Sequence, residues 1–168
     1  MNYSIWVIPS ESVNITLQKI IDQLSKEFGG PLFEPHMTII GGINQGLSEI
    51  EEKTYKIAQT LNTLELTLGP VSFSTTYFQN VLVRVNSTAL LMQLNLDFKK
   101  VFGEENSVFM PHISLLYGNQ NMETRERATS AFRLSPLTFT SSEFIITPST
   151  PNPSDWKHAA AIPFGSKK

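Results

Sequence analysis

The spacing of apolar residues along the chain switches repeatedly between two periods. Alternating or continuous apolar runs, which are typical of strands, occur at Tyr3–Ile8, Leu64–Phe73, Tyr77–Asn86, Thr138–Thr140, Glu143–Thr147 and His158–Ile162. Apolar stripes with the helical period occur at Val13–Phe28, Leu47–Leu61, Ala89–Phe102 and Glu123–Phe132. This pattern predicts an α+β fold.

The order of these elements repeats. Each half has a strand, which is Val81–Val85 in the second half, followed by a helix that a glycine closes, Gly29 in the first half and Gly103 in the second. A short loop and another strand follow in both halves, and we expect the first of these strands to stop at Gly41-Gly42. The repeat predicts two βαβ-type lobes related by a pseudo-twofold axis, intertwined in a single bilobal domain over residues 1–168.

Composition and charge narrow the function. Apolar residues make up 40% of the 168 residues, which is enough for a sizeable core, and charged residues make up 17%, below the usual ~25%. The formal net charge is −2, and Lys99-Lys100 is the closest approach to a basic run. Proteins that bind long RNA or DNA usually present a basic face, so we expect a small substrate and no long nucleic acid partner. No segment suggests self-association, which favours a monomer.

Other features of the composition exclude whole classes of site. The chain has no cysteine, which excludes disulfides, thiolate nucleophiles and cysteine-based zinc sites. Residues Met1–Pro9 lack the basic and apolar regions of a signal peptide, and no apolar run approaches the ~20 residues that span a bilayer. We therefore expect a soluble, cytoplasmic protein without a membrane partner.

Two short segments match each other in residue type at every position. Pro35–Ile39 and Pro111–Leu115 each read proline, histidine, apolar, hydroxyl, apolar, and together they hold two of the three histidines. Because side chains alternate faces along a strand, the histidine and the hydroxyl of each segment share one face, and the apolar residues point into the core. A pseudo-twofold axis would bring both polar faces to one cleft between the lobes, where ligand pockets tend to form.

The residue types that meet in this cleft suit the hydrolysis of a phosphate ester. Thr38 and Ser114 can donate hydrogen bonds to phosphate oxygens and stabilise charge in the transition state. His36 and His112, with ordinary pKa values near ~6.5, can divide the proton transfers at neutral pH between a base and an acid. The motifs therefore predict a metal-independent phosphodiesterase with His36 and His112 as catalytic residues, without a cofactor, acting on a small cyclic phosphate.

A zinc site is the main alternative for paired histidines. Such a site needs three or four ligands, and Glu34 is the only carboxylate within two positions of either motif strand. The third histidine, His158, has no counterpart in the repeat and is interpreted as a structural or surface residue. No metal site is predicted.

The paired Pro-His-x-Thr/Ser pattern resembles the two-histidine phosphoesterase superfamily. Within it, the chain is similar to the cyclic phosphodiesterases first known from plants and fungi, over nearly its full length. The segments that carry this similarity are Tyr3–Pro9, Phe28–Thr38, Tyr77–Val81 and Met110–Tyr117. The resemblance implies a bilobal α+β fold in which two antiparallel sheets line a central cleft and helices lie outside.

The resemblance also implies a substrate class. It implies hydrolysis of ADP-ribose 1″,2″-cyclic phosphate, a product of tRNA splicing, to ADP-ribose 1″-phosphate. Nucleoside 2′,3′-cyclic phosphates, opened to nucleoside 2′-phosphates, are the related substrates. By analogy with relatives, His112 is expected to be the base and His36 the acid.

Further site residues follow from the resemblance. Tyr117 matches a position near the phosphate, but strict alternation puts it on the face opposite His112, so that role needs a strand end or a bulge. Four aromatic residues lie at or next to aromatic positions of the family: Trp6, Tyr77, Phe78 and Trp156. Each is expected either to stack on a base or ribose, which would make Trp6 a substrate-binding residue, or to pack in the core. Arg84 stands where the plant-type pattern is apolar. Its side chain either faces the cleft and contacts a phosphate or is solvated, and we expect it to be solvated.

Two rival functions remain open. A 2′-5′ RNA ligase-like protein or an RNA 3′-end phosphodiesterase would carry basic residues around its cleft, and the acidic chain argues against both. A nucleotide-binding module without turnover would not require two matched proton carriers. The presence of both histidines and both hydroxyls favours an enzyme over such a module.

Overall fold

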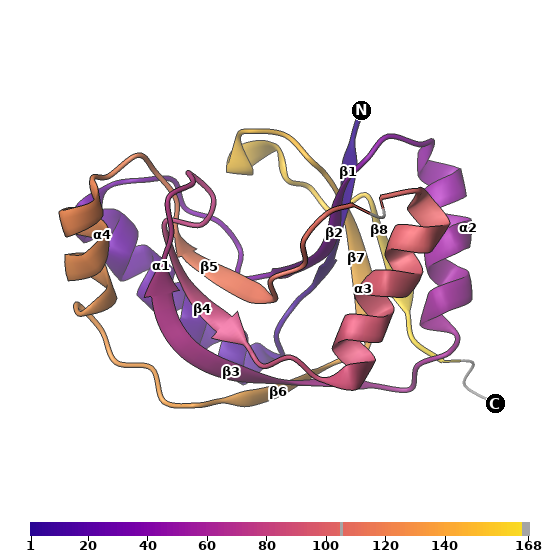
Figure 1. The fold of residues 1–168 in the computed structure, drawn as a ribbon, viewed down its shortest axis with the longest axis horizontal. Helices are drawn as coiled ribbons and strands as arrows, with labels where there is room; N and C mark the ends of the chain where they lie inside the picture. The colour runs from indigo at the N-terminus through magenta and orange to yellow at the C-terminus, as the bar shows by residue number, and fades with distance from the viewer. Residues whose placement is uncertain (105, 166–168) are drawn as a thin grey trace.

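The computed structural model describes residues 1–104 and 106–165 (Figure 1). In chain order, the elements are β1 (Tyr3–Val7), α1 (Glu11–Phe28), β2 (Met37–Ile43), α2 (Leu47–Ala58), β3 (Leu64–Phe73), β4 (Val81–Val85), α3 (Ala89–Phe102), β5 (His112–Leu116), α4 (Met122–Thr129), β6 (Thr138–Ser141), β7 (Glu143–Pro148), the 3₁₀ turn η1 (Pro153–Asp155) and β8 (Ala160–Pro163). Strands and helices therefore mix along the chain, as the apolar pattern predicts.

The strands form two four-stranded sheets in which every neighbouring pair is antiparallel. The first sheet has the order β2-β1-β7-β8, and the second has the order β5-β4-β3-β6. Helices α2 and α3 contact the first sheet and α1 and α4 contact the second, toward opposite ends of the molecule in Figure 1. The edge strands β2 and β5 contact each other at the centre. The bilobal α+β fold with two antiparallel sheets is thus confirmed.

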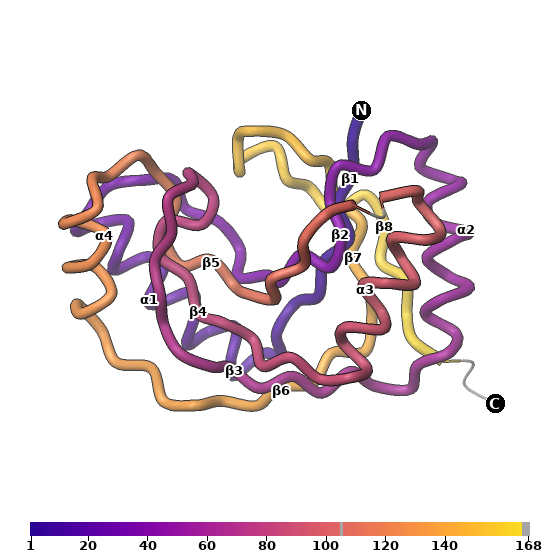
Figure 2. Tube along the Cα trace, in the orientation of Figure 1, coloured from indigo at the N-terminus to yellow at the C-terminus, as the bar shows by residue number. Residues whose placement is uncertain are grey.

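Each half of the chain contributes to both sheets. Helix α1 follows β1 of the first sheet but contacts β5 of the second, and α3 follows β4 of the second sheet but contacts β2 of the first. The Cα trace in Figure 2 allows these crossings to be followed. The prediction of βαβ-type lobes is wrong in its strand pairing, since such units pair their strands in parallel. Periodicity identifies the apolar face of a helix but not the sheet that this face meets.

Several element boundaries differ from the predicted ones. Strand β2 does not stop at Gly41-Gly42 but runs past both, because Gly42 adopts a φ of 75° where the pairing with β1 is irregular. The broader range Tyr77–Asn86 is too long, and the strand has the bounds Val81–Val85 that the repeat predicts. Helices α2 and α4 end before their predicted last residues, and β8 begins after His158. Helix α3 and strand β3 have the predicted bounds.

Both motif strands carry an extra residue directly after the hydroxyl residue. Consecutive residues of β1 pair with Thr38 and with the residue two positions after it on β2, so the residue between these two has no partner. Consecutive residues of β4 pair in the same way with Ser114 and with the residue two positions after it on β5. Ile39 and Leu115 are therefore the inserted residues, and an insertion of this kind locally bends and twists a strand. The repeat extends from residue type to the irregularities of the backbone.

The apolar positions of the two motifs lie in the core, as predicted. Met37, Ile39, Ile113 and Leu115 are each at most 1% exposed. Burial of such side chains stabilises the fold by roughly 1.5–3 kcal/mol each, and it fixes the polar faces of β2 and β5 toward the space between the sheets. In the described part of the chain, no helix combines the length and apolar character needed to cross a bilayer.

Candidate active site

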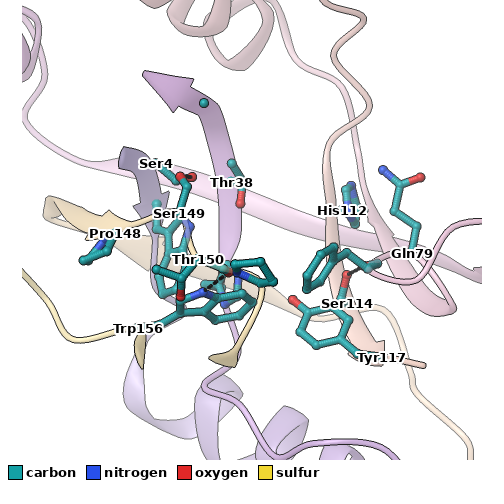
Figure 3. Close-up of a pocket in the computed structure, with 15 residues that line it drawn as sticks. Ser4, Thr38, Gln79, His112, Ser114, Tyr117, Pro148, Ser149, Thr150 and Trp156 are labelled. Atoms are coloured by element: carbon teal, nitrogen blue, oxygen red, sulfur yellow. Dashed lines mark hydrogen bonds between the residues drawn. The ribbon is translucent and has the colours of Figure 1, made fainter. Parts of the chain in front are cut away.

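A cavity of about 470 Å³ lies at the two motif strands (Figure 3). Its walls come from β1, β2 and β5, from the loop before β4 and from the segment that follows β7. Six lining residues are the site residues predicted from the sequence: His36, Thr38, His112, Ser114, Tyr117 and Trp6. The fold therefore brings the two polar faces, which are far apart in the chain, to one cavity.

The two histidines are held in the same way. Nδ1 of His36 lies 2.7 Å from the carbonyl oxygen of Glu34, and Nδ1 of His112 lies 2.7 Å from the carbonyl oxygen of Met110. Because a carbonyl oxygen only accepts, each Nδ1 must carry the hydrogen and donate it. In a neutral ring the other nitrogen, Nε2, is then unprotonated and can accept a proton. Each ring is thus fixed in the tautomer that a general base requires.

Aromatic rings enclose His36. The indole of Trp6 stacks on its imidazole with centroids 3.6 Å apart and an interplanar angle of 13°. Trp156 and Phe33 approach edge-on at 5.6 and 6.5 Å. The His36 side chain keeps only a small contact with solvent, since the residue is 7% exposed.

Burial controls the charge of His36. Removal from water lowers the pKa of His36 to about 4, against a smaller opposite effect of the hydrogen bond to the Glu34 carbonyl. Positive charge on His112 and on His158 lowers the pKa further. At neutral pH, His36 in the free protein is uncharged.

His112 is more accessible. It is partly exposed as the first residue of β5. Burial lowers the pKa of His112 as well, the hydrogen bond to the Met110 carbonyl raises it, and the positive charge of Arg84 lowers it. The two histidines therefore share their backbone anchor but differ in their surroundings.

The two hydroxyls are in different states. Ser114 Oγ donates to the carbonyl oxygen of Phe78 at 2.7 Å, so its hydrogen is already engaged. The Thr38 side chain makes no hydrogen bond to any residue of the described chain, and it lines the cavity. Thr38 is thus a free donor, whereas Ser114 must exchange a partner before it can bind a ligand through its hydrogen.

Tyr117 reaches the cavity because β5 has a strand end and a bulge, and either of these was expected to allow it. The strand ends at Leu116, and the inserted residue Leu115 reverses the alternation that would otherwise turn Tyr117 away. The ring stacks on Phe33 with centroids 3.8 Å apart, and the residue is 3% exposed. Burial raises the pKa of Tyr117, so its phenol remains a protonated donor.

The remaining aromatic predictions divide between cavity and packing. Trp6, Phe78 and Trp156 line the cavity, and the Trp156 indole donates to the carbonyl oxygen of Thr150 at 2.8 Å. Tyr77 is not among the lining residues and stacks behind Tyr117, with centroids 6.3 Å apart. Trp6 is only 3% exposed, so it packs in the core and lines the cavity at the same time.

Sequence reasoning missed a polar end of the cavity. The missed lining residues at this end are Ser4, Gly42, Pro148, Ser149, Thr150 and Pro151. Gln79 was also missed and lies beside His112, on the opposite side of the cavity (Figure 3). The Oγ atoms of Ser4 and Ser149 lie 2.5 Å apart, which joins β1 to the segment after β7 (Figure 3). Serines and prolines near a strand end carry no signal of their own, so only the pairing of β1 with β7 could have indicated this wall.

Arg84 lies beside the site. It is partly buried, it pairs with His112 across the β4–β5 ladder, and its charge acts on that histidine. No ion pair joins Arg84 to another residue of the described chain, so the interpretation of Arg84 as a solvated residue stays a prediction.

His158 is a surface residue, as interpreted from the sequence, and is not among the residues that line the cavity. Its Nε2 lies 2.7 Å from Glu34 Oε2, with both side chains more than 40% exposed. Glu34 thereby bonds two histidines, His36 through its carbonyl and His158 through its carboxylate. Among residues 1–104 and 106–165, no group of three or more histidine and carboxylate side chains could hold a metal ion.

Solved structures with low sequence identity share this fold. TT0787 of Thermus thermophilus aligns with a TM-score of 0.71 at 15% identity, over all of both chains. LigT of E. coli, solved in a complex with 3′-AMP, aligns with a TM-score of 0.61 at 15% identity, over 98% of each chain. The duplicated two-sheet arrangement is thus common to these proteins.

Sequence comparisons identify the family. A cyclic phosphodiesterase of Arabidopsis thaliana is 29% identical over 127 residues, which are 75% of this chain and 70% of that protein. The sequence model of the family described as "Cyclic phosphodiesterase-like protein" matches residues 1–143. The chain therefore belongs to the cyclic phosphodiesterase-like family of two-histidine phosphoesterases, and it is a phosphoesterase hydrolase.

Proposed function

We propose that the protein hydrolyses cyclic phosphodiesters without a metal ion. Its substrates are ADP-ribose 1″,2″-cyclic phosphate, opened to the 1″-phosphate, and nucleoside 2′,3′-cyclic phosphates, opened to the 2′-phosphates. The observation that carries this proposal is the pair of Nδ1-anchored imidazoles, His36 and His112, at one cavity. Each offers Nε2 for a proton transfer, and such transfers contribute typically 10²–10⁴-fold to a rate.

The reaction needs one base and one acid. A water molecule attacks phosphorus, one imidazole removes its proton, and a new P–O bond forms. The P–O bond of the ring breaks, and the other histidine, as imidazolium, gives its proton to the departing sugar oxygen. Thr38 donates to a non-bridging oxygen. The Tyr117 phenol donates as negative charge grows, and the Ser114 hydroxyl does so once it has left the Phe78 carbonyl.

The surroundings of the histidines favour His36 as the base. A buried ring with a pKa of about 4 is uncharged at neutral pH and ready to accept a proton. His112 is more open to solvent, so it can take up a proton from water when an anionic substrate stabilises its charged form. This assignment is the reverse of the one expected by analogy with relatives.

The charge of the cavity matches a cyclic phosphodiester. Apart from the two histidines, none of its lining residues is ionisable near neutral pH, and none is a lysine, arginine, aspartate or glutamate. A cyclic phosphodiester carries a single negative charge, which neutral donors and one imidazolium can balance. The aromatic side chains of Trp6, Phe78 and Trp156 provide faces on which a base can stack.

A direct assay tests the proposal. The protein is incubated in EDTA with 2′,3′-cyclic AMP and with ADP-ribose 1″,2″-cyclic phosphate, and products are separated by chromatography. We expect adenosine 2′-phosphate and ADP-ribose 1″-phosphate respectively, at rates that EDTA leaves unchanged. Failure to open either ring, or activity that returns only when a divalent metal is added, would overturn the proposal. The double variant His36→Ala/His112→Ala serves as the blank.

A further inference from the structure

A cation lies beside the site but outside its cavity. Arg84, on β4, is the direct cross-strand partner of His112 on β5. Residues directly opposite each other in an antiparallel pair project from the same face of the sheet. The face in question also carries Ser114, because His112 and Ser114 are two positions apart before the inserted residue. Arg84 therefore projects from the face that carries this half of the site.

The guanidinium is close enough to act on the histidine and is otherwise free. Its positive charge contributes to the lowered pKa of His112. Among the described residues, Arg84 takes part in no ion pair and donates no side-chain hydrogen bond. Since a guanidinium has five donors and stays charged, a partly buried one without a partner is suited to an anion from outside.

The neighbouring strand has a glycine beside Arg84. On β3, the residues opposite the Arg84 region are Gly69 and Pro70, which lie between the paired positions Leu68 and Val71. A Cβ on Gly69 would come 2.7 Å from Asn86 Oδ1, which is closer than real Cβ contacts, and 3.5 Å from Arg84 Cβ, which is an ordinary contact. At this irregular position, β3 therefore places no side chain of Gly69 between Arg84 and Asn86.

We propose that Arg84 binds a second phosphate group of the substrate, which extends out of the cavity past His112. The inference rests on the proposed function, since it takes the scissile phosphate to lie between the histidines. Arg84 is not among the residues that line the cavity, so the phosphate that it meets is not the reacting one. The preferred substrate class is then a cyclic phosphate that carries at least one further phosphate, as a pyrophosphate, a terminal monoester or a phosphodiester.

The test compares substrates that differ by one phosphate. Adenosine 2′,3′-cyclic phosphate is the reference. Its 5′-phosphorylated form, ADP-ribose 1″,2″-cyclic phosphate and a diadenylate ending in a 2′,3′-cyclic phosphate represent the three sources of the second group. In Arg84→Gln, we expect KM to rise at least ~10-fold for one or more of these three, with little change in kcat, because a charge-assisted hydrogen bond is lost. KM for the reference should change less than ~3-fold.

Controls separate a contact from a general effect of charge. Arg84→Lys should recover part of the affinity, and Arg133→Gln removes the same charge from an exposed position outside the cavity and should leave all four KM values unchanged. If KM instead changes equally for all four substrates and the pH profile shifts, Arg84 acts only through the charge of His112, and the inference is overturned. No change in any KM would overturn it as well. A wild-type protein that opens none of the four rings would instead contradict the proposed function.

Discussion

The two halves of the site keep the same backbone anchor for their histidine and differ in what covers the ring. His36 lies under Trp6 and beside Trp156, whereas His112 is partly open and has Arg84 as its neighbour. The anchor fixes the tautomer, and the cover sets how readily each ring is charged. A duplicated motif can thus supply two identical groups, and unequal burial is enough to give them different proton chemistry.

The largest expected effect comes from removing either imidazole. His36→Ala and His112→Ala should each lower kcat on 2′,3′-cyclic AMP by ~10²–10⁴-fold at pH 7, with the circular dichroism spectrum unchanged. An aryl phosphodiester such as bis(p-nitrophenyl) phosphate sharpens the comparison, because its leaving group needs no proton. On that substrate His112→Ala should regain most of its rate and His36→Ala should not. The opposite pattern would make His112 the base.

The hydroxyls should show a smaller and unequal loss. Thr38→Ala removes a free donor, and we expect a fall in kcat of ~10–10³-fold. Ser114→Ala should have the lesser effect, since the hydrogen of Ser114 is held by the Phe78 carbonyl. Thr38→Ser and Ser114→Thr, which keep the hydroxyl, are the matched controls in steady-state assays. Equal losses at both positions would show that the Ser114–Phe78 bond yields readily to substrate.

The burial of His36 should also appear in stability. Its pKa is about 4 in the folded state and near ~6.5 in an unfolded chain, so the unfolded state takes up a proton first as pH falls. Stability is then complete above pH ~6.5 and declines toward pH 4, by on the order of 2–3 kcal/mol. Urea unfolding at pH 7 and pH 4.5 measures this decline. The decline in stability should be smaller in His36→Gln than in His112→Gln. An equal decline in both variants would show that the two histidines do not differ in their effect on stability.

The smallest expected effect comes from removing one of the aromatic side chains that surround His36. Trp156→Ala exposes one edge of His36 and should raise its pKa, so the acidic limb of the pH profile of kcat/KM moves upward by about one unit. Trp156→Phe keeps an aromatic ring there and should move the limb less. NMR titration of the His36 ring gives its pKa directly. An unchanged pKa in Trp156→Ala would show that Trp6 alone, and not Trp156, keeps the pKa of His36 low.

The sequence predicts the parts of the site that depend on local pattern. Two matching pentapeptides are enough to identify His36, Thr38, His112 and Ser114, because alternation along a strand assigns their faces without knowledge of the fold. The inward positions of Met37 and Ile113 follow from the same rule and are confirmed. The catalytic roles themselves remain predictions for the assays above.

Features that depend on pairing between distant segments could not be predicted from the sequence. Arg84 gains its place beside His112 only through the register of β4 and β5, and Ser149 joins the cavity only because β7 pairs with β1. The inserted Ile39 and Leu115 are ordinary apolar residues in the sequence. Register and long-range pairing are set by the sum of many contacts, so a single chain shows them in no local pattern.

The exchange of α1 and α3 between the sheets bears on how the protein can move. Two lobes that are threaded through each other in this way cannot separate as rigid bodies on one linker. The spacing of the two imidazoles is therefore built into the backbone before any ligand arrives, a form of preorganisation that leaves only small segments, such as the one that carries Trp156, to adjust around different substrates.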